Sequence, residues 1–116
     1  MASKLKLTPV YVTLLSITPL KVNFDPPELP VDRRNGKVQT VTWKRKGGMD
    51  FTFAALTFFA ANPFKSAVVN DDSISAVDEN ENDEVHFYSV IVKANHAYYN
   101  SRDRVHIDDS PTIRNK

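Results

Sequence analysis

The sequence predicts an all-β protein, an antiparallel sandwich of about seven short strands. Three observations predict this fold class. Short runs rich in β-branched and aromatic residues recur along the chain, and turn-forming clusters separate them at spacings of about ten residues. No window carries an apolar period of about 3.6 residues over three turns, as an amphipathic helix would. The 116 residues fit one domain, which we assign to residues 1–116.

Composition and charge argue against several classes of protein. The hydrophobic share of 41% and the charged share of 25% are those of a globular chain, which argues against disorder of the whole chain. Fifteen basic and fourteen acidic residues leave a formal net charge of +1, whereas nucleic-acid-binding domains usually carry a strong basic excess. The absence of cysteine removes disulfides, thiolate metal sites and cysteine nucleophiles. We therefore expect no cofactor and no nucleic-acid partner.

The N-terminal segment shows no targeting signal. Lys4 and Lys6 precede no apolar region with a small-residue cleavage site. The apolar run Val10–Ile17 is too short to span a bilayer. We expect a cytoplasmic protein without membrane contact.

The first half of the chain predicts three strands. Three prolines between residues 25 and 30 indicate an extended connection, because proline disfavours helices and central strands. Asn35-Gly36 is a hairpin dipeptide, and residues 44–48 are expected to form a charged turn. The three strands are Val10–Ile17, Lys21–Phe24 and Val38–Lys44, the last with Val41 and Trp43 on one face.

The second half of the chain predicts further strands and one clear hairpin. The aromatic content of Phe51–Phe59 favours a strand, while its alanines leave a helical turn open. The hairpin turns at Asn95-His96, because asparagine and histidine tolerate a positive φ. Residues 114–116 are expected to be a loose tail. The other strands are Ser66–Val69, Ile74–Val77, Val85–Lys93 and Ala97–Ser101.

Several segments resemble those of known β-sandwich proteins. Val41-Thr42-Trp43, an aromatic strand, an acidic loop and Tyr88-Ser89-Val90-Ile91-Val92 resemble the succession in immunoglobulin-like and cupredoxin-like sandwiches. This implies an immunoglobulin-like antiparallel β-sandwich, with Trp43 in the core and Tyr88 as a tyrosine corner. The ending 109–115, together with Asp25-Pro26, resembles small bacterial sandwich proteins of the DP-EP family. The resemblance implies a fold but no activity, and a blue-copper site is excluded because it needs a cysteine.

The evenly spaced histidines suggest one metal site. In a hairpin centred near Asn95, a residue near position 105 would face His86, so His86 and His106 would meet at the hairpin base. Two histidines and a carboxylate form a common set of metal ligands. The alternative is that His86 is a surface strand residue and His106 a loop residue. The predicted ligands are His86, His106 and Asp108, with Asp83 or Asp109 as the alternative carboxylate.

Two charged segments suggest weaker hypotheses. Asp78, Asn80 and Asn82 follow the first half of a calcium loop, but the required glycine and final glutamate are replaced by Asp83 and Ser89. A solvated acidic loop explains this segment more simply. Residues 44–46, with basic residues 33–34, could contact phosphate beside Trp43. Neighbouring strand residues face opposite ways, however, which favours a buried tryptophan followed by a charged turn.

The sequence shows no nucleophile elbow, phosphate loop or metalloprotease pair, so we expect no enzymatic activity. One of Phe58 and Phe59, and one of Tyr98 and Tyr99, is expected to point outward. We expect a protein-binding or structural module that contacts a partner, or a second copy of itself, through a sheet edge or an aromatic patch. The alternatives are a small-ligand or metal-binding sandwich that uses His86 and His106, and a structural component of a phage or secretion system.

Overall fold

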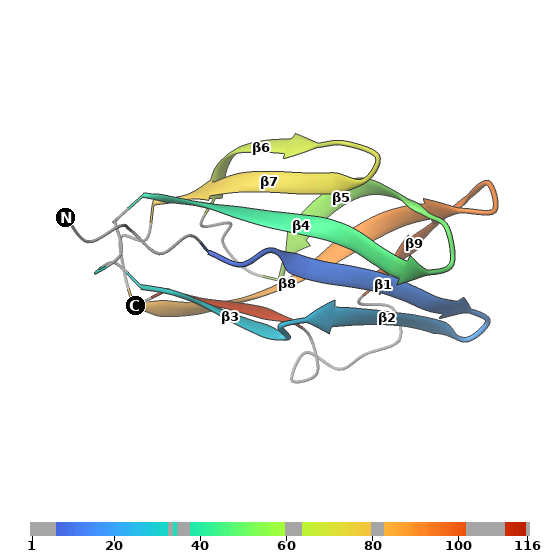
Figure 1. The fold of residues 1–116 in the computed structure, drawn as a ribbon, viewed down its shortest axis with the longest axis horizontal. Coiled ribbons are helices and arrows are strands. Elements are labelled where there is room, and N and C mark those ends of the chain that lie inside the picture. Colours follow the sequence, from blue (N-terminus) through green and yellow to red (C-terminus); the bar gives the residue numbers. More distant parts are fainter. Residues whose placement is uncertain are drawn as a thin grey trace.

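The computed structural model describes residues 7–32, 34, 38–59, 64–79, 83–101 and 111–115. Within these residues the chain forms ten strands in two facing sheets (Figure 1). The predicted all-β sandwich is therefore confirmed, and it has more strands than the sequence predicts. The strands are β1 (Val10–Ile17), β2 (Leu20–Asp25), β3 (Glu28–Val31), β4 (Gln39–Gly48), β5 (Thr52–Phe58), β6 (Phe64–Val69), β7 (Ser73–Asp78), β8 (Glu84–Ala94), β9 (Ala97–Asn100) and β10 (Thr112–Asn115).

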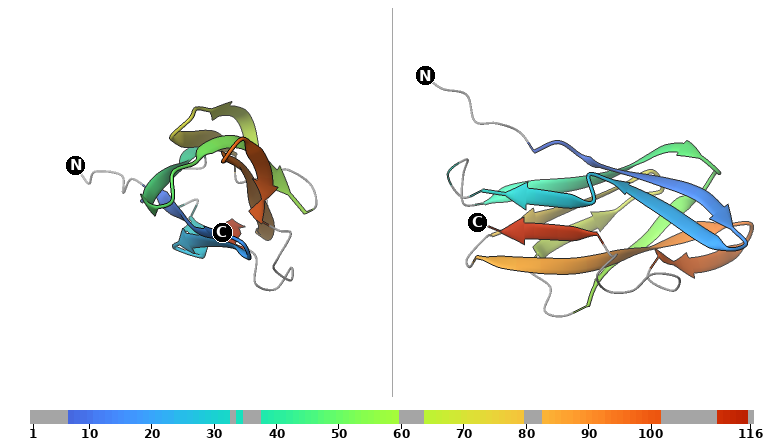
Figure 2. Two further views of the ribbon diagram at one scale, coloured as in Figure 1. Left: turned by 90° about the vertical axis from the view of Figure 1, so that its right-hand side faces the viewer. Right: turned by 90° about the horizontal axis from the view of Figure 1, so that it is seen from below.

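The strand order distinguishes inner from outer strands. The first sheet has the order β2-β1-β4-β7-β6, and the second has the order β3-β10-β8-β5, with β9 also paired to β8. The pairs β1–β4 and β3–β10 are parallel, so both sheets are mixed rather than purely antiparallel. Seen end-on in Figure 2, the strands curve around one common interior. β2 and β6 are the outer strands of the first sheet.

Aromatic side chains join the two sheets across this interior. Trp43 on β4 and Tyr88 on β8 are fully buried, and their rings meet edge to face with centroids 5.4 Å apart. Phe64 on β6 lies 5.8 Å from the Trp43 ring and 5.3 Å from the Phe58 ring on β5. Such ring pairs add to the stability gained from apolar burial. The cluster therefore anchors the N-terminal end of β6 to the second sheet.

β4 is longer than the sequence predicts. Residues 44–48, expected to form a turn, continue the strand because they pair in parallel with β1, as far as Leu14 opposite Gly48. The Thr13 hydroxyl donates a hydrogen bond of 2.6 Å to the Lys46 carbonyl. At Gly48, φ is +69°, and a Cβ would lie 2.5 Å from the Leu14 carbonyl oxygen. Only glycine allows this close approach without strain.

Two other segments differ from the prediction. Residues 28–30, expected to belong to a connection, form the outer strand β3 together with residue 31. The missing amide hydrogen of Pro30 costs no ladder bond inside the sheet. Residues 114 and 115, expected to be loose, belong to β10, which is held between β3 and β8. The predicted turn at Asn35-Gly36 lies outside the described residues.

The predictions for β5 and for the β8–β9 hairpin are confirmed. Thr52–Phe58 is a strand paired with β8, so the helical alternative is wrong. Asn95 and His96 form the hairpin turn with φ values of 49° and 64°. Positive φ at both central residues matches the twist of the flanking strands. The tip of the hairpin therefore has a defined conformation.

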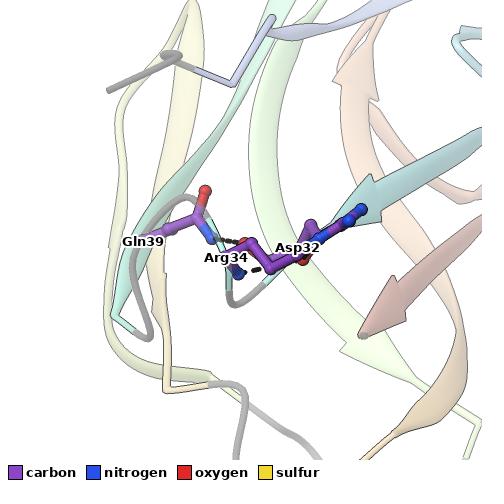
Figure 3. A network of polar contacts seen from close by, with 3 residues as sticks. All are labelled: Asp32, Arg34 and Gln39. Atoms are coloured by element: carbon purple, nitrogen blue, oxygen red, sulfur yellow. Dashed lines mark hydrogen bonds and ion pairs between the residues drawn. The ribbon is translucent and has the colours of Figure 1, made fainter. Parts of the chain in front are cut away.

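A polar network links the end of β3 to the start of β4 (Figure 3). Arg34 donates to Oδ2 of Asp32 from Nε and Nη2, at 3.0 and 2.6 Å. Gln39 donates from Nε2 to the Asp32 carbonyl at 2.9 Å. Hydrogen bonding to Asp32 and the charge of its carboxylate raise the pKa of the Arg34 guanidinium. The hydrogen bond from Gln39 thus ties the end of β3 in the second sheet to the start of β4 in the first.

Candidate functional site

Of the three predicted metal ligands, only His86 belongs to the described residues. Its side chain is 10% exposed, and its Nε2 lies 3.3 Å from Oε2 of Glu84 on the same strand. Its ring meets the Phe58 ring edge to face with centroids 6.4 Å apart. His86 is therefore held between a carboxylate and an aromatic ring rather than exposed on the surface.

The residue opposite His86 is Ile113 of β10, not a residue near position 105 as expected. The β8–β9 ladder ends at Asn100, and β10 takes the place beside β8 beyond that point. His106, Asp108 and the alternative ligand Asp109 lie outside the described residues. No group of three His, Cys, Asp or Glu side chains in the described segments could hold a metal ion. The predicted metal site stays a prediction.

The first and last residues of the hypothetical calcium loop form hydrogen bonds between strands. Asp78 is the last residue of β7, is fully buried, and accepts a hydrogen bond of 3.2 Å from Nδ2 of Asn115. The hydroxyl of Ser89 lies 2.6 Å from the hydroxyl of Thr57 on the neighbouring strand. Both contacts hold strands together, which argues against calcium binding by this pattern.

Trp43 and Tyr88 lie in the core, but Tyr88 is not a tyrosine corner. A tyrosine corner bonds its hydroxyl to the backbone a few residues upstream. Here the Tyr88 hydroxyl and Trp43 Nε1 are both buried without a hydrogen bond of good geometry. Burial raises the pKa of the Tyr88 phenol, and the nearby Trp43 N–H partly offsets that rise. The pair is a structural part of the core, out of reach of a surface ligand.

Outer strand β6 exposes large apolar side chains, unlike the described outer strands β2, β3 and β5. Val68 and Val69 are 52% and 39% exposed. They follow a bulge in the β6–β7 ladder and pair regularly with Ser75 and Ile74 of β7. Successive strand residues point to opposite faces, so both faces of β6 end in an exposed valine. We call the outer side of residues 66–69 the β6 edge.

A cationic surface occupies one end of the sandwich. Figure 1 shows the end of β4, the β1–β2 turn and the tip of the β8–β9 hairpin at this same end. We call Lys44, Arg45, Lys46 and Lys93 the cationic end. An open groove of about 670 Å³ there is lined by Arg45, Asp50, Phe51, Thr52, Lys93, Ala94, Asn95 and His96. A neighbouring depression of about 420 Å³ is lined by Lys44, Arg45, Asp72 and Ser73.

Two of these cations cover aromatic rings. Lys46 Nζ lies 5.0 Å from the centroid of the Tyr11 ring, and Lys93 Nζ lies 5.6 Å from that of Tyr98. Such contacts are attractive, because the face of an aromatic ring is electron-rich and stabilises a cation placed above it. Arg45 donates from Nη1 to the Phe51 carbonyl, which directs its guanidinium toward the groove. The cations therefore have defined positions without being neutralised.

The basic residues fall into two groups by their partners. Arg34 and Arg114 form ion pairs with Asp32 and Glu28. The four residues of the cationic end form no ion pair with any described residue. Arg34 lies at the other end of β4, so it does not join residues 44–46 as expected, and Arg33 lies outside the described residues. Lys21 of β2 likewise forms no ion pair with a described residue, but the cationic end is where four such cations lie close together in the sequence or the fold.

The aromatic expectations are confirmed in part. Tyr98 is 65% exposed while Tyr99 packs on the core, so one of the two points outward as predicted. Phe58 packs against Phe64 and Tyr88, and Phe59 is partly buried, so neither is left fully on the surface. The described residues therefore offer one exposed tyrosine rather than a broad aromatic patch.

No protein-family model matches the chain, and no curated protein sequence is significantly similar to it. None of the described segments forms a helix of the length and hydropathy needed to cross a membrane. The function is therefore inferred from the β6 edge and the cationic end.

The β6 edge and the groove follow from strand order, which is a non-local property. The sequence predicts a strand at Ser66–Val69 but not its outer position. The signal present is the pair Val68-Val69, because one of two adjacent strand residues must face away from the core. The sequence likewise does not show that Lys93 lies near Arg45, since the β5–β8 ladder brings them together.

Proposed function

We propose that this protein is a non-enzymatic binding and structural module, an immunoglobulin-like sandwich that pairs its β6 edge with the same strand of a second copy. The observation that carries the proposal is the exposure of Val68 and Val69 on an outer strand, 52% and 39%. An outer strand presents unpaired backbone N–H and C=O groups that a further strand can satisfy. The two valines add apolar area that association removes from water.

The β6 edge is suited to pair with the same edge of a second copy of the chain. Residues 66–70 carry no charge, so antiparallel pairing of two such segments brings no like charges together. Twofold symmetry places the same apolar patch on both sides of the interface. Because the exposed segment is short, we expect a weak association that depends on concentration.

Sedimentation velocity over concentrations up to about 1 mM tests this proposal, since weak complexes populate only near that range. We expect the wild type to associate reversibly. The double variant Val68→Lys/Val69→Lys is expected to weaken association about tenfold or more, because pairing would bury two charges in each copy. Its thermal unfolding is expected to stay close to that of the wild type, since both positions are exposed.

Leu15→Lys is the matched control. Leu15 is an exposed apolar residue, 57% accessible, but it lies on the inner strand β1. This change is expected to leave association unaltered. A wild type that stays monomeric at about 1 mM contradicts the proposal, and so does a double variant that associates as the wild type does.

A further inference from the structure

The cationic end forms a second surface, separate from the β6 edge. We infer that it binds an acidic segment of a protein partner, with carboxylates of that segment placed against Lys44, Arg45 and Lys93, which line the groove and the adjoining depression. This binding goes beyond the pairing of β6 strands and depends on different residues. Three observations support it. The cations lie close together, they have no anionic partners among the described residues, and lysines cover one face of the neighbouring tyrosine rings.

The fold brings these cations together from distant parts of the sequence. Thr52 of β5 lies opposite Lys93 of β8, and the β4–β5 connection places Arg45 on the other wall of the groove. Lys44 precedes Arg45 on β4 and lines the adjoining depression with it, so positive charge lines both the groove and the depression. Positive groups gathered at one concave surface attract an anionic partner and raise its association rate.

The cations are free to accept such a partner. None of them forms an ion pair with a described residue, whereas Arg34 and Arg114 at the other end each hold a carboxylate. The hydrogen bond from Arg45 to the Phe51 carbonyl uses Nη1, and a guanidinium carries five N–H donors. The remaining donors can hold a carboxylate in a bidentate manner.

The aromatic rings favour a polypeptide over a single-stranded nucleic acid. Nucleic-acid surfaces use open ring faces to stack bases, but Lys46 covers one face of Tyr11 and Lys93 covers one face of Tyr98. Asp50 and Asp72 also line the groove and the depression, and they would repel a continuous phosphate chain. An acidic polypeptide can space its carboxylates between them and offer backbone amides to these aspartates.

A glutamate-rich peptide of about ten residues is a suitable probe, with the matching glutamine peptide as its control. Binding to the full chain is measured by isothermal titration, and amide NMR shifts identify the contact residues. We expect the glutamate peptide alone to bind, to shift amides near residues 45 and 93–96, and to lose affinity as salt rises from about 20 to 300 mM.

Variants locate the binding surface. Lys44→Gln/Lys93→Gln is expected to weaken peptide binding about four- to tenfold, the combined effect of two exposed ion pairs. Arg34→Gln/Arg114→Gln removes the same charge from the opposite end and is expected to leave binding unchanged. The variant Val68→Lys/Val69→Lys is expected to bind the peptide normally, so loss of self-association and loss of peptide binding are separate results.

Four results would overturn the inference. The glutamate peptide fails to bind, or the glutamine peptide binds equally well. Removing the Lys44 and Lys93 charges has no larger effect than removing those of Arg34 and Arg114. An oligothymidine strand of similar charge binds as tightly as the peptide, which would assign the surface to nucleic acid instead.

Discussion

β2 and β6 are the two outer strands of one sheet, but they present different edges to solvent. On β2 the exposed side chains are Lys21, Asn23 and Asp25, while the apolar residues between them pack against the core. Prolines at positions 19 and 26 flank the strand. On β6 the exposed side chains include Val68 and Val69, and residues 66–70 carry no charge.

The difference shows how this fold controls association. Charged side chains and prolines are the common means of protecting a sheet edge from pairing with another chain. β2 carries both, and outer strand β3 contains Pro30. β6 has a bulge near Ser66, but its two valines follow the bulge in regular pairing. An apolar edge opposite a protected edge of the same sheet is suited to a partner strand.

The largest effect on stability is expected when the buried residue paired with the β6 edge is truncated. Ile74 of β7 is fully buried opposite Val69. Ile74→Ala is expected to lower the free energy of unfolding by about 2–5 kcal/mol, because it leaves a cavity. Val69→Ala is expected to cost less than about 1 kcal/mol, because that side chain is partly in water. Urea denaturation measures both, and equal losses would show that Val69 belongs to the core.

The inner strands of the same sheet offer a second contrast. Gly48→Ala is expected to cost about 2–4 kcal/mol, since its Cβ would meet the Leu14 carbonyl at 2.5 Å and its φ is +69°. Gly47→Ala, with φ of +56° and no atom within 4 Å, is expected to cost about 1 kcal/mol. Equal urea midpoints for the two variants would mean that β1 and β4 are not so closely paired.

A pH measurement tests the core that lies between the edges. Burial raises the pKa of the Tyr88 phenol above its ordinary value of 10.0. Above pH 10 the unfolded chain ionises while the folded core stays neutral, so the unfolded state binds fewer protons and stability falls. The loss is up to about 1.4 kcal/mol per pH unit, and it is absent below pH 10. Tyr88→Phe is expected to remove this part of the slope, and an unchanged slope would mean that the phenol reaches water.

The smallest effect is expected from making β2 resemble β6. Lys21→Val/Asn23→Val places two apolar side chains at exposed positions of the other outer strand. Association by sedimentation is expected to rise about two- to fivefold, because the β2 edge loses its charge and polarity. No gain would mean that the flanking prolines alone protect this edge.

Local chemistry made most of the fold predictable from the sequence. Alternation placed Trp43 in the core, a run of β-branched and aromatic residues marked β1, and Asn95-His96 gave the hairpin turn. The failures involve pairing between distant segments. Residues 44–48 read as a turn because two glycines and three cations dominate them, yet the parallel ladder with β1 extends the strand. β3 pairs with β10, which lies far from it in the sequence, and no local pattern shows such a pairing.

The candidate surfaces were less predictable than the fold. The sequence shows the basic cluster at residues 44–46, but the position of Lys93 beside it depends on the β5–β8 register. Val68 and Val69 were visible as a strand, but exposure at both positions follows from the place of β6 at the end of its sheet. Likewise, Ile113 lies opposite His86 because β10 returns from the chain end to join β8.

Amide hydrogen exchange at low and high protein concentration tests the contrast between the two edges most directly. If the β6 edge pairs with a second copy, the outward amides of residues 66–69 gain protection at high concentration, and those of residues 20–25 do not. Protection that appears on β2 instead, or a β6 edge that exchanges equally fast at every concentration while the protein associates, would contradict this account.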